Sequence, residues 1–333
     1  MIDNDAYQQA ASLIESSTNV LITTHTKPDG DACGCVAAMA EVLRCRGKTA
    51  RPLFLSAMPD WYGFLFDESV PVLGQDVQIG DLTGGAQGPI DLIVIMDTNS
   101  NRQLPGFEDF LGQTDVPVLV FDHHVTSDHL GQVEIADHTA AAAGIVLFEF
   151  LQSVGWTVTA KVAEALFVAI STDTGWFHLR NADSRVFRCA LELIEAGVEP
   201  SDVYFKLYQS CSPQRFKLMA AMLGTLELKL NDRYAEQYLD REAFDRTGAA
   251  YRDTENLINE CQRIATVKVA ALFIEQRDGR IRCSLRSRGD IVVSDIAAKF
   301  GGGGHKMAAG TFLPAPLEHA RQLIFDEVAK ILS

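Results

Sequence analysis

The feature that most constrains the fold is a series of short, uninterrupted apolar segments in the first half of the chain. These segments read NVLITT at residues 19–24, DLIVIM at residues 91–96 and VPVLVF at residues 116–121. A strand that is apolar at nearly every position is buried on both faces, which is typical of a parallel sheet covered by helices. We therefore expect such a sheet to form the core of this part of the chain.

Segments with helical character alternate with these strands. Their Ala and Leu content predicts helices over residues 5–17, 31–45, 140–153, 161–170 and 185–196, and residues 51–55 are a further expected strand. Parallel neighbours need crossover connections, which helices supply. The expected fold class is therefore α/β, with an N-terminal parallel-sheet domain over residues 1–197.

The pattern changes after residue 197. Residues 198–223 are expected to form a helical connector, and residues 224–333 a smaller α/β domain with a mixed or antiparallel sheet. The closely spaced strands expected there are residues 225–230, 234–239, 267–275 and 280–286, with helices near 254–264 and at the C-terminus.

Charge and cysteine content limit the functions that the chain can have. Asp and Glu number 44 against 29 Lys and Arg, a formal net charge of −15, which argues against a surface that grips long duplex nucleic acid or an anionic membrane. A small anionic substrate at a locally positive site remains open. The seven cysteines are an odd, scattered set, and the acidic first residues lack the features of a signal peptide, so we expect reduced thiols and a cytoplasmic protein.

Four polar clusters follow predicted elements at positions where ligands gather in open α/β sheets. They are the segment from His25 to Asp31, Asp97, the triplet Asp122-His123-His124, and Asp173. Each alone has an ordinary explanation as a turn, a helix cap or a surface group. Together they would concentrate carboxylates at one edge of the sheet, so we expect cations among them.

The ligand types bear on which cations these are. A mixed set of imidazoles and carboxylates suits Mn²⁺ better than Mg²⁺, which prefers oxygen ligands. We therefore expect two divalent metal ions, with Mn²⁺ favoured and Mg²⁺ or Co²⁺ as alternatives.

These motifs also carry a resemblance. The sequence HTKPDGDACG, the isolated Asp97, the DHH triplet at 122–124 and STDTG at 171–175 resemble, in order, the four motifs of the DHH phosphoesterase superfamily. The segment from SLRS at 284–287 through FGGGGH at 300–305 to AAG at 308–310 resembles the C-terminal domain that commonly accompanies them. The closest resemblance is to the bacterial bifunctional oligoribonuclease and pAp phosphatase (nanoRNase, NrnA-like) family. Cys35 departs from the Ser that many relatives carry.

The resemblance implies a ligand set and a mechanism. One metal would be held by His25, Asp29 and Asp97, and the other by Asp31, Asp97, His123 and Asp173. A hydroxide bridging two such metals would attack phosphorus in line. His124 is the candidate for assisting the leaving oxygen, and Asp122 for orienting a histidine ligand. The products would be mononucleotides from short oligoribonucleotides, or pAp without its 3′-phosphate.

A basic stretch near the C-terminus is the candidate substrate-binding segment. Residues 277–306 contain seven Lys and Arg against three Asp. Arg286 could bind a phosphate bidentately, and the glycine run at 301–304 could form a loop whose N–H groups bind an anion. The expected substrate-binding residues are Arg286, Ser287, Gly302, Gly303, Gly304 and His305. Two domains joined by a connector would create a cleft that measures substrate length.

Other readings of the same motifs stay open. Within enzymes they are a cyclic- or linear-dinucleotide phosphodiesterase, a RecJ-like exonuclease and a DHH-type pyrophosphatase. Outside enzymes, the chain could be a non-catalytic nucleotide-binding sensor, although every expected ligand position is occupied. The expected partners are short oligonucleotides or small nucleotides, and a homodimer formed at an exposed sheet edge is possible.

Overall fold

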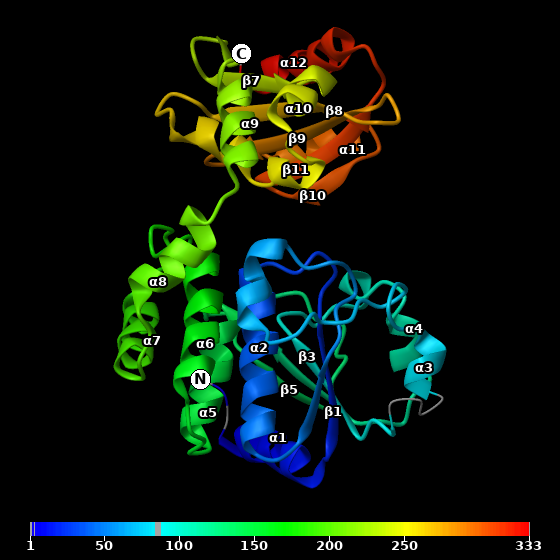
Figure 1. The fold of residues 1–333 in the computed structure, drawn as a ribbon, viewed down its shortest axis with the longest axis vertical. Helices are drawn as coiled ribbons and strands as arrows, with labels where there is room; N and C mark the ends of the chain where they lie inside the picture. The colour runs from blue at the N-terminus through cyan, green and yellow to red at the C-terminus, as the bar shows by residue number, and fades with distance from the viewer. Residues whose placement is uncertain (1, 3, 84–87, 333) are drawn as a thin grey trace. The chain divides into compact units, whose positions relative to one another are not determined.

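The structure is a computed structural model that describes residues 2, 4–83 and 88–332. The chain forms two compact units, Met1–Ser210 and Cys211–Ser333 (Figure 1). The division lies inside the segment expected to be the connector. Each unit has its own sheet and its own hydrophobic cores.

The N-terminal unit is an α/β domain. Its strands are β1 Asn19–Thr24, β2 Thr49–Pro52, β3 Leu92–Met96, β4 Val118–Asp122 and β5 Val133–Ala136. Its longer helices are α1 Asn4–Ser16, α2 Gly30–Cys45, α5 Ala143–Ser153, α6 Ala160–Asp173 and α7 Ser184–Glu195. Shorter helices are η1 Asp60–Leu65, α3 Ile79–Thr83, η2 Asn101–Gln103, α4 Glu108–Leu111, α8 Pro200–Tyr204 and the π-helix η3 Phe205–Gln209.

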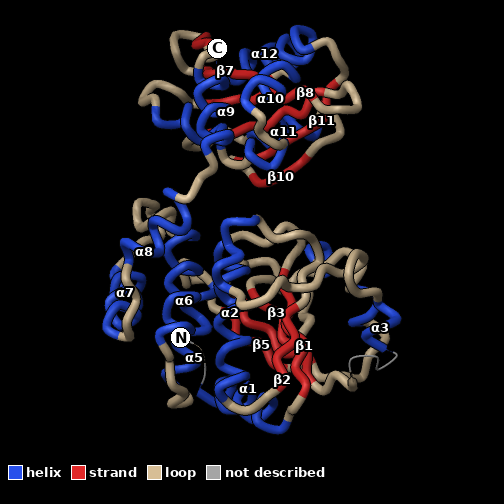
Figure 2. Tube along the Cα trace, viewed as in Figure 1, coloured by secondary structure: helices blue, strands red, loops and turns tan. Residues whose placement is uncertain are grey.

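The N-terminal sheet has the order β2-β1-β3-β4-β5, and every neighbouring pair is parallel. Alternate residues of the central strands face two cores. Ile22 and Val94 pack with α2, α5 and α6, while Leu21 and Ile93 pack with α4 and with the residues that connect it to η2. Figure 2 shows the strands between these helical layers. The predicted α/β class with a buried parallel sheet is confirmed.

The C-terminal unit has a mixed sheet of order β10-β11-β9-β8-β7-β6, in which only β7 and β8 pair in parallel. The strands are β6 Glu227–Lys229, β7 Tyr234–Leu239, β8 Val269–Glu275, β9 Ile281–Ser287, β10 Gly303–His305 and β11 Ala308–Leu313. The helices are α9 Pro213–Leu223, α10 Arg241–Thr247, η4 Tyr251–Thr254, η5 Leu257–Arg263, α11 Val293–Ala298 and α12 Leu317–Leu332. The predicted second α/β domain is confirmed.

Three local predictions were wrong. The helical connector is interrupted before Pro213, because proline disfavours a helical residue before it and Ser212 instead caps α9 through the N–H of Arg215. The helix expected near 254–264 is two 3₁₀ segments separated by Asn256, whose φ is +60°. The strand expected at 51–55 begins and ends earlier, as β2.

Two negative findings concern the described residues alone. No helix among them combines the length and the apolar character needed to cross a bilayer. All seven cysteines, each within the described chain, are free thiols.

Candidate active site

Polar side chains from five elements meet at the carboxyl edge of the N-terminal sheet. His25 follows β1, Asp97 follows β3 and His123 follows β4. Asp31 lies in the first turn of α2, and Asp173 is the last residue of α6. The fold thus brings together the residues that the sequence predicted as metal ligands.

Asp29 begins α2 as its N-cap. Its Oδ1 accepts hydrogen bonds from the N–H groups of Asp31 at 3.0 Å and Ala32 at 3.2 Å. The same oxygen lies 4.0 Å from Nε2 of His25. An ordinary capping interaction therefore also places a carboxylate beside the histidine that follows β1.

Asp97 is buried at the centre of the cluster. Its Oδ2 lies 3.4 Å from Nε2 of His25, and its Oδ1 lies 3.5 Å from Nε2 of His123. Ligand atoms that share an ion at about 2.0–2.2 Å lie roughly 3–3.5 Å from each other, so both separations suit metal coordination. Oδ1 is buried and has no hydrogen-bond partner within the described chain. A carboxylate facing both histidines in this way is suited to bridging two ions.

His123 is oriented by a backbone carbonyl. Its Nδ1 lies 3.1 Å from the oxygen of Ala140, so Nδ1 carries the proton and Nε2 is available as a ligand. Nε2 lies 3.8 Å from Oδ2 of Asp31 and 3.7 Å from Oδ2 of Asp173. Burial, followed by the nearby His124, lowers the pKa of His123 and so favours the neutral ring that binds metal.

Asp31 is held by the N-terminus of α5. The N–H groups of Ala143 and Gly144 donate to its two carboxylate oxygens at 2.6 and 2.9 Å, and the Cys35 thiol donates to Oδ1 at 3.3 Å. Both backbone donors belong to the first turn of the helix, where N–H groups lack partners within the helix. They keep the carboxylate in place and favour its anionic form.

Glycines in α2 allow this helix to approach α6. A Cβ on Gly34 would lie 2.5 Å from the carbonyl oxygen of Ala165, and one on Gly30 would lie 2.3 Å from Oγ1 of Thr172. Since α2 carries Asp31 and α6 ends at Asp173, this close contact brings the two carboxylates near each other.

Burial and mutual repulsion raise the pKa of three carboxylates in the cluster. Burial, and then the charge of neighbouring carboxylates, raises the pKa of Asp31 and of Asp97 well above the usual range. Burial, followed by Asp29, raises the pKa of Asp173 to about 7. Divalent cations would relieve the same repulsion, so the charge, the donor types and the bare oxygen of Asp97 all fit bound metal.

Asp122 and His124 form a hydrogen-bonded pair at the cluster, where Nδ1 of His124 also lies 3.7 Å from Oδ1 of Asp97 and His124 groups with Asp97 and His123 as a possible metal-holding set. Nδ1 of His124 lies 2.8 Å from Oδ1 of Asp122, and this hydrogen bond raises the pKa of His124. The same oxygen accepts from the N–H groups of His123 at 2.8 Å and His124 at 3.2 Å. Asp122 therefore orients the ring of His124, whereas the ring of His123 is oriented by Ala140.

Arg286 and Ser287, the predicted substrate-binding residues of β9, have different surroundings. The Arg286 side chain is half-buried and donates to the carbonyl of Leu285 at 3.1 Å. Ser287 is buried, and its hydroxyl donates to the carbonyl of Ile291 at 2.6 Å. The Arg286 guanidinium has further donors for an anion, while the only hydroxyl proton of Ser287 is already used.

The glycine run is only partly a loop, contrary to the sequence prediction. Gly303 and Gly304 belong to β10 and pair with Gly310 and Ala309 of β11. A Cβ on Gly302 would lie 2.3 Å from the carbonyl oxygen of Gly310, so the absence of side chains lets this segment pack tightly beside β11. His305 ends β10, and its side chain lies outside the described part of the chain.

Sequence reasoning missed the groups that orient the cluster. Three are backbone atoms of residues 140–144, which no side-chain motif reveals. Another is Arg185 of α7. Its guanidinium donates hydrogen bonds to Asp137 at 2.8 Å and to Glu149 at 2.6 Å, and so connects the residues on either side of segment 140–144. An Arg within an amphipathic helix gives no signal that distinguishes it from a surface residue.

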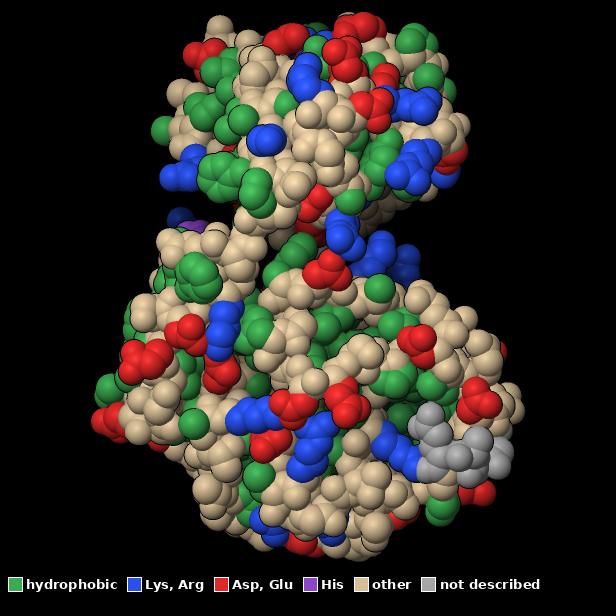
Figure 3. All heavy atoms as spheres, viewed as in Figure 1, with side chains coloured by type: hydrophobic (Ala, Val, Ile, Leu, Met, Phe, Trp, Pro, Cys, Tyr) green, Lys and Arg blue, Asp and Glu red, His purple; other side chains and the backbone are tan. Residues whose placement is uncertain are grey.

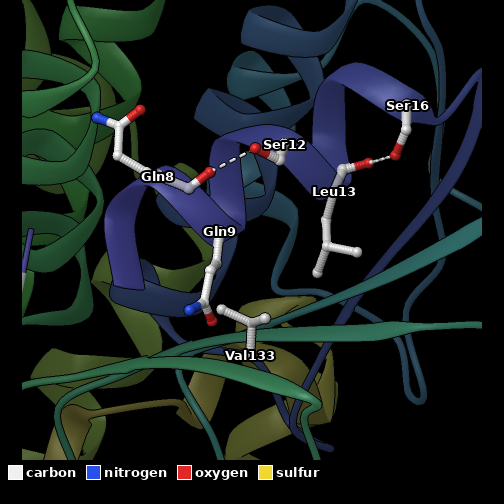
Figure 4. A pocket seen from close by; sticks show the side chains of 6 residues that line it. All are labelled: Gln8, Gln9, Ser12, Leu13, Ser16 and Val133. Carbon is white, nitrogen blue, oxygen red and sulfur yellow. Dashed lines mark hydrogen bonds between the residues drawn. The ribbon is translucent and has the colours of Figure 1, made fainter. Parts of the chain in front are cut away.

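A surface hollow on α1 is separate from this cluster. Its lining residues are Gln8, Gln9, Ser12, Leu13, Ser16 and Val133 (Figure 4). Val133 begins β5, so the hollow lies toward the amino end of that strand, away from the edge that carries His123. It contains no titratable side chain, and we assign it no chemistry.

Comparison with known proteins agrees with this fold. Residues 19–170 match the N-terminal domain of the DHH family, and residues 231–333 match the DHHA1 domain. The chain therefore contains a DHH N-terminal domain followed by a DHHA1 domain.

Individual proteins are similar to this chain over nearly its full length. A curated relative is the bifunctional oligoribonuclease and PAP phosphatase NrnA of Thermus thermophilus, 28% identical over 319 residues that cover 94% of this chain and 90% of the relative. An exopolyphosphatase-related protein from Bacteroides fragilis has a TM-score of 0.88 at 22% identity, covering 100% of this chain and 98% of that one. The exonuclease RecJ bound to manganese has a TM-score of 0.56 at 15% identity, covering 97% and 94%. The two structural likenesses show a shared fold.

Proposed function

We propose that this protein is a metal-dependent phosphoesterase that hydrolyses short oligoribonucleotides to mononucleotides and removes the 3′-phosphate of pAp. The observation that carries the proposal is the convergence of the predicted ligands on one sheet edge: His25, Asp29, Asp31, Asp97, His123 and Asp173. The relative named NrnA supports this choice of substrates.

The ligands divide into two groups. His25, Asp29 and Asp97 would hold one divalent metal ion, and Asp31, His123 and Asp173 the other; Asp97, whose Oδ1 lies 3.5 Å from Nε2 of His123, would be shared between them. When bound, such ions lower the pKa of water and neutralise charge on the phosphoryl oxygens. The mixed nitrogen and oxygen donors favour Mn²⁺, which is also present in the RecJ structure.

The remaining groups act on protons and on the substrate. His124, whose pKa Asp122 raises, would keep a proton on Nε2 and donate it to the leaving oxygen. Arg286 would bind a substrate phosphate through its fork of N–H donors. Ser287, Gly302, Gly303, Gly304 and His305 stay predicted contacts of the same phosphate.

Charge supports a small substrate rather than a long polyanion. Acidic and basic side chains are interspersed on the face in view (Figure 3), and the net charge is −15. Up to four of the acidic residues would be neutralised by bound cations. We further propose that the enzyme acts in the cytoplasm; the homodimer stays a prediction.

The test is a panel of substrates with the full-length protein. Mn²⁺-dependent release of mononucleotide from a 5′-phosphorylated dinucleotide, and of phosphate from pAp, is the expected result. A cyclic dinucleotide, pyrophosphate and polyphosphate are run in parallel, and Asp97→Asn is the inactive control. Preferential turnover of any of these three substrates would replace the proposed function by the corresponding alternative.

A further inference from the structure

The sheet of the C-terminal unit has one face that is only partly covered. On β9 and β11, Ile281, Cys283, Leu285 and Leu313 point into the core under α11 and α12. Because side chains alternate along a strand, the residues between them point to the opposite face. On that face, three cross-strand pairs stand in register: Arg282 with Phe312, Ser284 with Gly310, and Arg286 with Ala308.

Strand β8, the neighbour of β9, closes one side of this face. Its residues Ala270, Leu272 and Ile274, which pair with β9, belong to the core that α9, α10 and η5 cover. Figure 1 shows α9 and α10 over β7 and β8, and β10 at the far side of the sheet. The part formed by β9, β11 and β10 is therefore where this face reaches the surface.

The middle of this open part is a floor of small residues. Ser284, Ala308 and Gly310 are half-buried, and Gly303 of β10 pairs with Gly310. A Cβ on Gly303 would have no atom within 4 Å. No side chain larger than a hydroxymethyl group rises from these four positions, so a flat group can approach the backbone.

An aromatic ring stands at one end of the floor. Phe312 exposes 48% of its surface, although the guanidinium of Arg280 lies 4.5 Å from its ring centroid. Arg280 is itself held by Asp278 at 2.7 Å. The ring is therefore supported on one side and accessible elsewhere, with the exposed Arg282 directly across the strand pair.

A single exposed phenylalanine is common and needs no function. Here, however, the ring shares a face with two arginines that no ion pair within the described chain neutralises, Arg282 and Arg286. Aromatic rings and arginines on an open sheet face are the means by which proteins bind single-stranded nucleotides, because every base has a π-face and every linkage a negative charge. The charge and the ring thus fit the same ligand.

We propose that Phe312 stacks against a nucleobase of the substrate, with Arg282 beside the linking phosphate and Arg286 at a phosphate further along. Four residues of extended strand separate the two arginines, a span of about 13 Å, which accommodates about two nucleotides. This inference rests on the proposed function and deepens it: the C-terminal unit would select phosphate esters that carry a base, with little preference for base identity. Purines, which have the larger ring system, would bind better than pyrimidines by a small factor.

The test compares Phe312→Leu and Phe312→Trp with the wild type. The substrates are a 5′-phosphorylated dinucleotide and the same compound with an abasic residue. Leu should raise KM for the intact dinucleotide about tenfold, the usual contribution of one base stack, without changing kcat. Trp should restore KM, and the abasic compound should not distinguish the three proteins. Phe216→Leu is the matched control, since Phe216 is a phenylalanine of α9 that is 63% exposed.

Binding of the intact dinucleotide to the metal-free full-length proteins, measured by calorimetry in EDTA, separates this inference from the proposed function. Weaker binding to the Leu variant supports stacking even if the wild type hydrolyses none of the panel. Unchanged KM and binding in Phe312→Leu, or an equal loss with the abasic compound, would overturn the inference while leaving the hydrolytic function intact.

Discussion

Replacing Asp173 by Asn should stabilise the metal-free protein. Burial and the neighbouring Asp29 raise the pKa of Asp173 from 3.8 to about 7 in the folded state. The folded protein therefore binds this proton more tightly than the unfolded chain does, and stability falls as the pH rises from about 4 to about 7. Above pH 7 Asp173 is ionised, and the folded state carries the full free-energy cost of that charge. Asn has the same shape and no charge, so the variant avoids that cost.

The size of the effect follows from the shift. The change in pKa of about three units corresponds to about 4 kcal/mol. Because a third of the Asp173 side chain is exposed, solvent screening reduces this to about 1–2 kcal/mol. For a unit of this size the melting temperature should rise by about 2–6 °C at pH 8 in EDTA and by almost nothing near pH 4.

The assay is thermal unfolding followed by circular dichroism in EDTA between pH 4 and pH 8, and again in saturating Mn²⁺. The metal should stabilise the wild type strongly and the variant weakly, which reverses their order. Asp115→Asn, in an exposed loop, is the matched control for loss of one negative charge. If the wild type is as stable as Asp173→Asn at pH 8 in EDTA, or gains stability as the pH rises from 4 to 7, the reasoning about repulsion in the cluster is wrong.

Three further outcomes are expected. Asp97→Asn should abolish turnover of every substrate. The circular dichroism spectrum should stay unchanged, because Asn also tolerates the φ of +59° found at this position. Residual Mn²⁺-dependent activity would contradict the central role of this carboxylate. Arg286→Ala should raise KM for 5′-phosphorylated substrates about tenfold at constant kcat, and an equal fall in kcat would contradict a binding role. Gly34→Ala should lower the free energy of unfolding in urea by about 2 kcal/mol, since its Cβ would lie 2.5 Å from a carbonyl oxygen of α6. Gly63→Ala, which meets no atom within 4 Å, is its control.

The elements that sequence analysis predicted well are those with a strong local signal. The strands around Leu21, Ile93 and Val120 are mostly apolar and are buried at nearly every position in the structure. Strand β5 was missed because its four residues, VEIA, are interrupted by a glutamate and give no apolar run. The helix expected to continue past Ser210 is interrupted before Pro213, where Ser212 caps α9.

The candidate ligands were predictable for a different reason. In a parallel sheet, residues that follow the strands meet at one edge whatever the loops between them do, so His25, Asp97 and His123 can be placed together from strand positions alone. The contacts that orient them depend on loop conformation. Ala140 and Gly144 act through backbone atoms, and their side chains carry no chemical signal.

The DHH triplet shows why position along a strand is not enough to assign a role. Asp122 is the last residue of β4, is buried and bonds the ring of His124, while His123 turns toward the carboxylates. In the proposed mechanism, the adjacent residues His123 and Asp122 thus have different roles: His123 would bind metal, and Asp122 orients His124, the candidate proton donor. This division needs the carbonyl of Ala140, because a ring of His123 bonded instead to Asp122 could not present Nε2 to Asp97. The segment that carries Ala140 and the first turn of α5 therefore orients a histidine and a carboxylate of one cluster, and any change that moves it alters both ligands together.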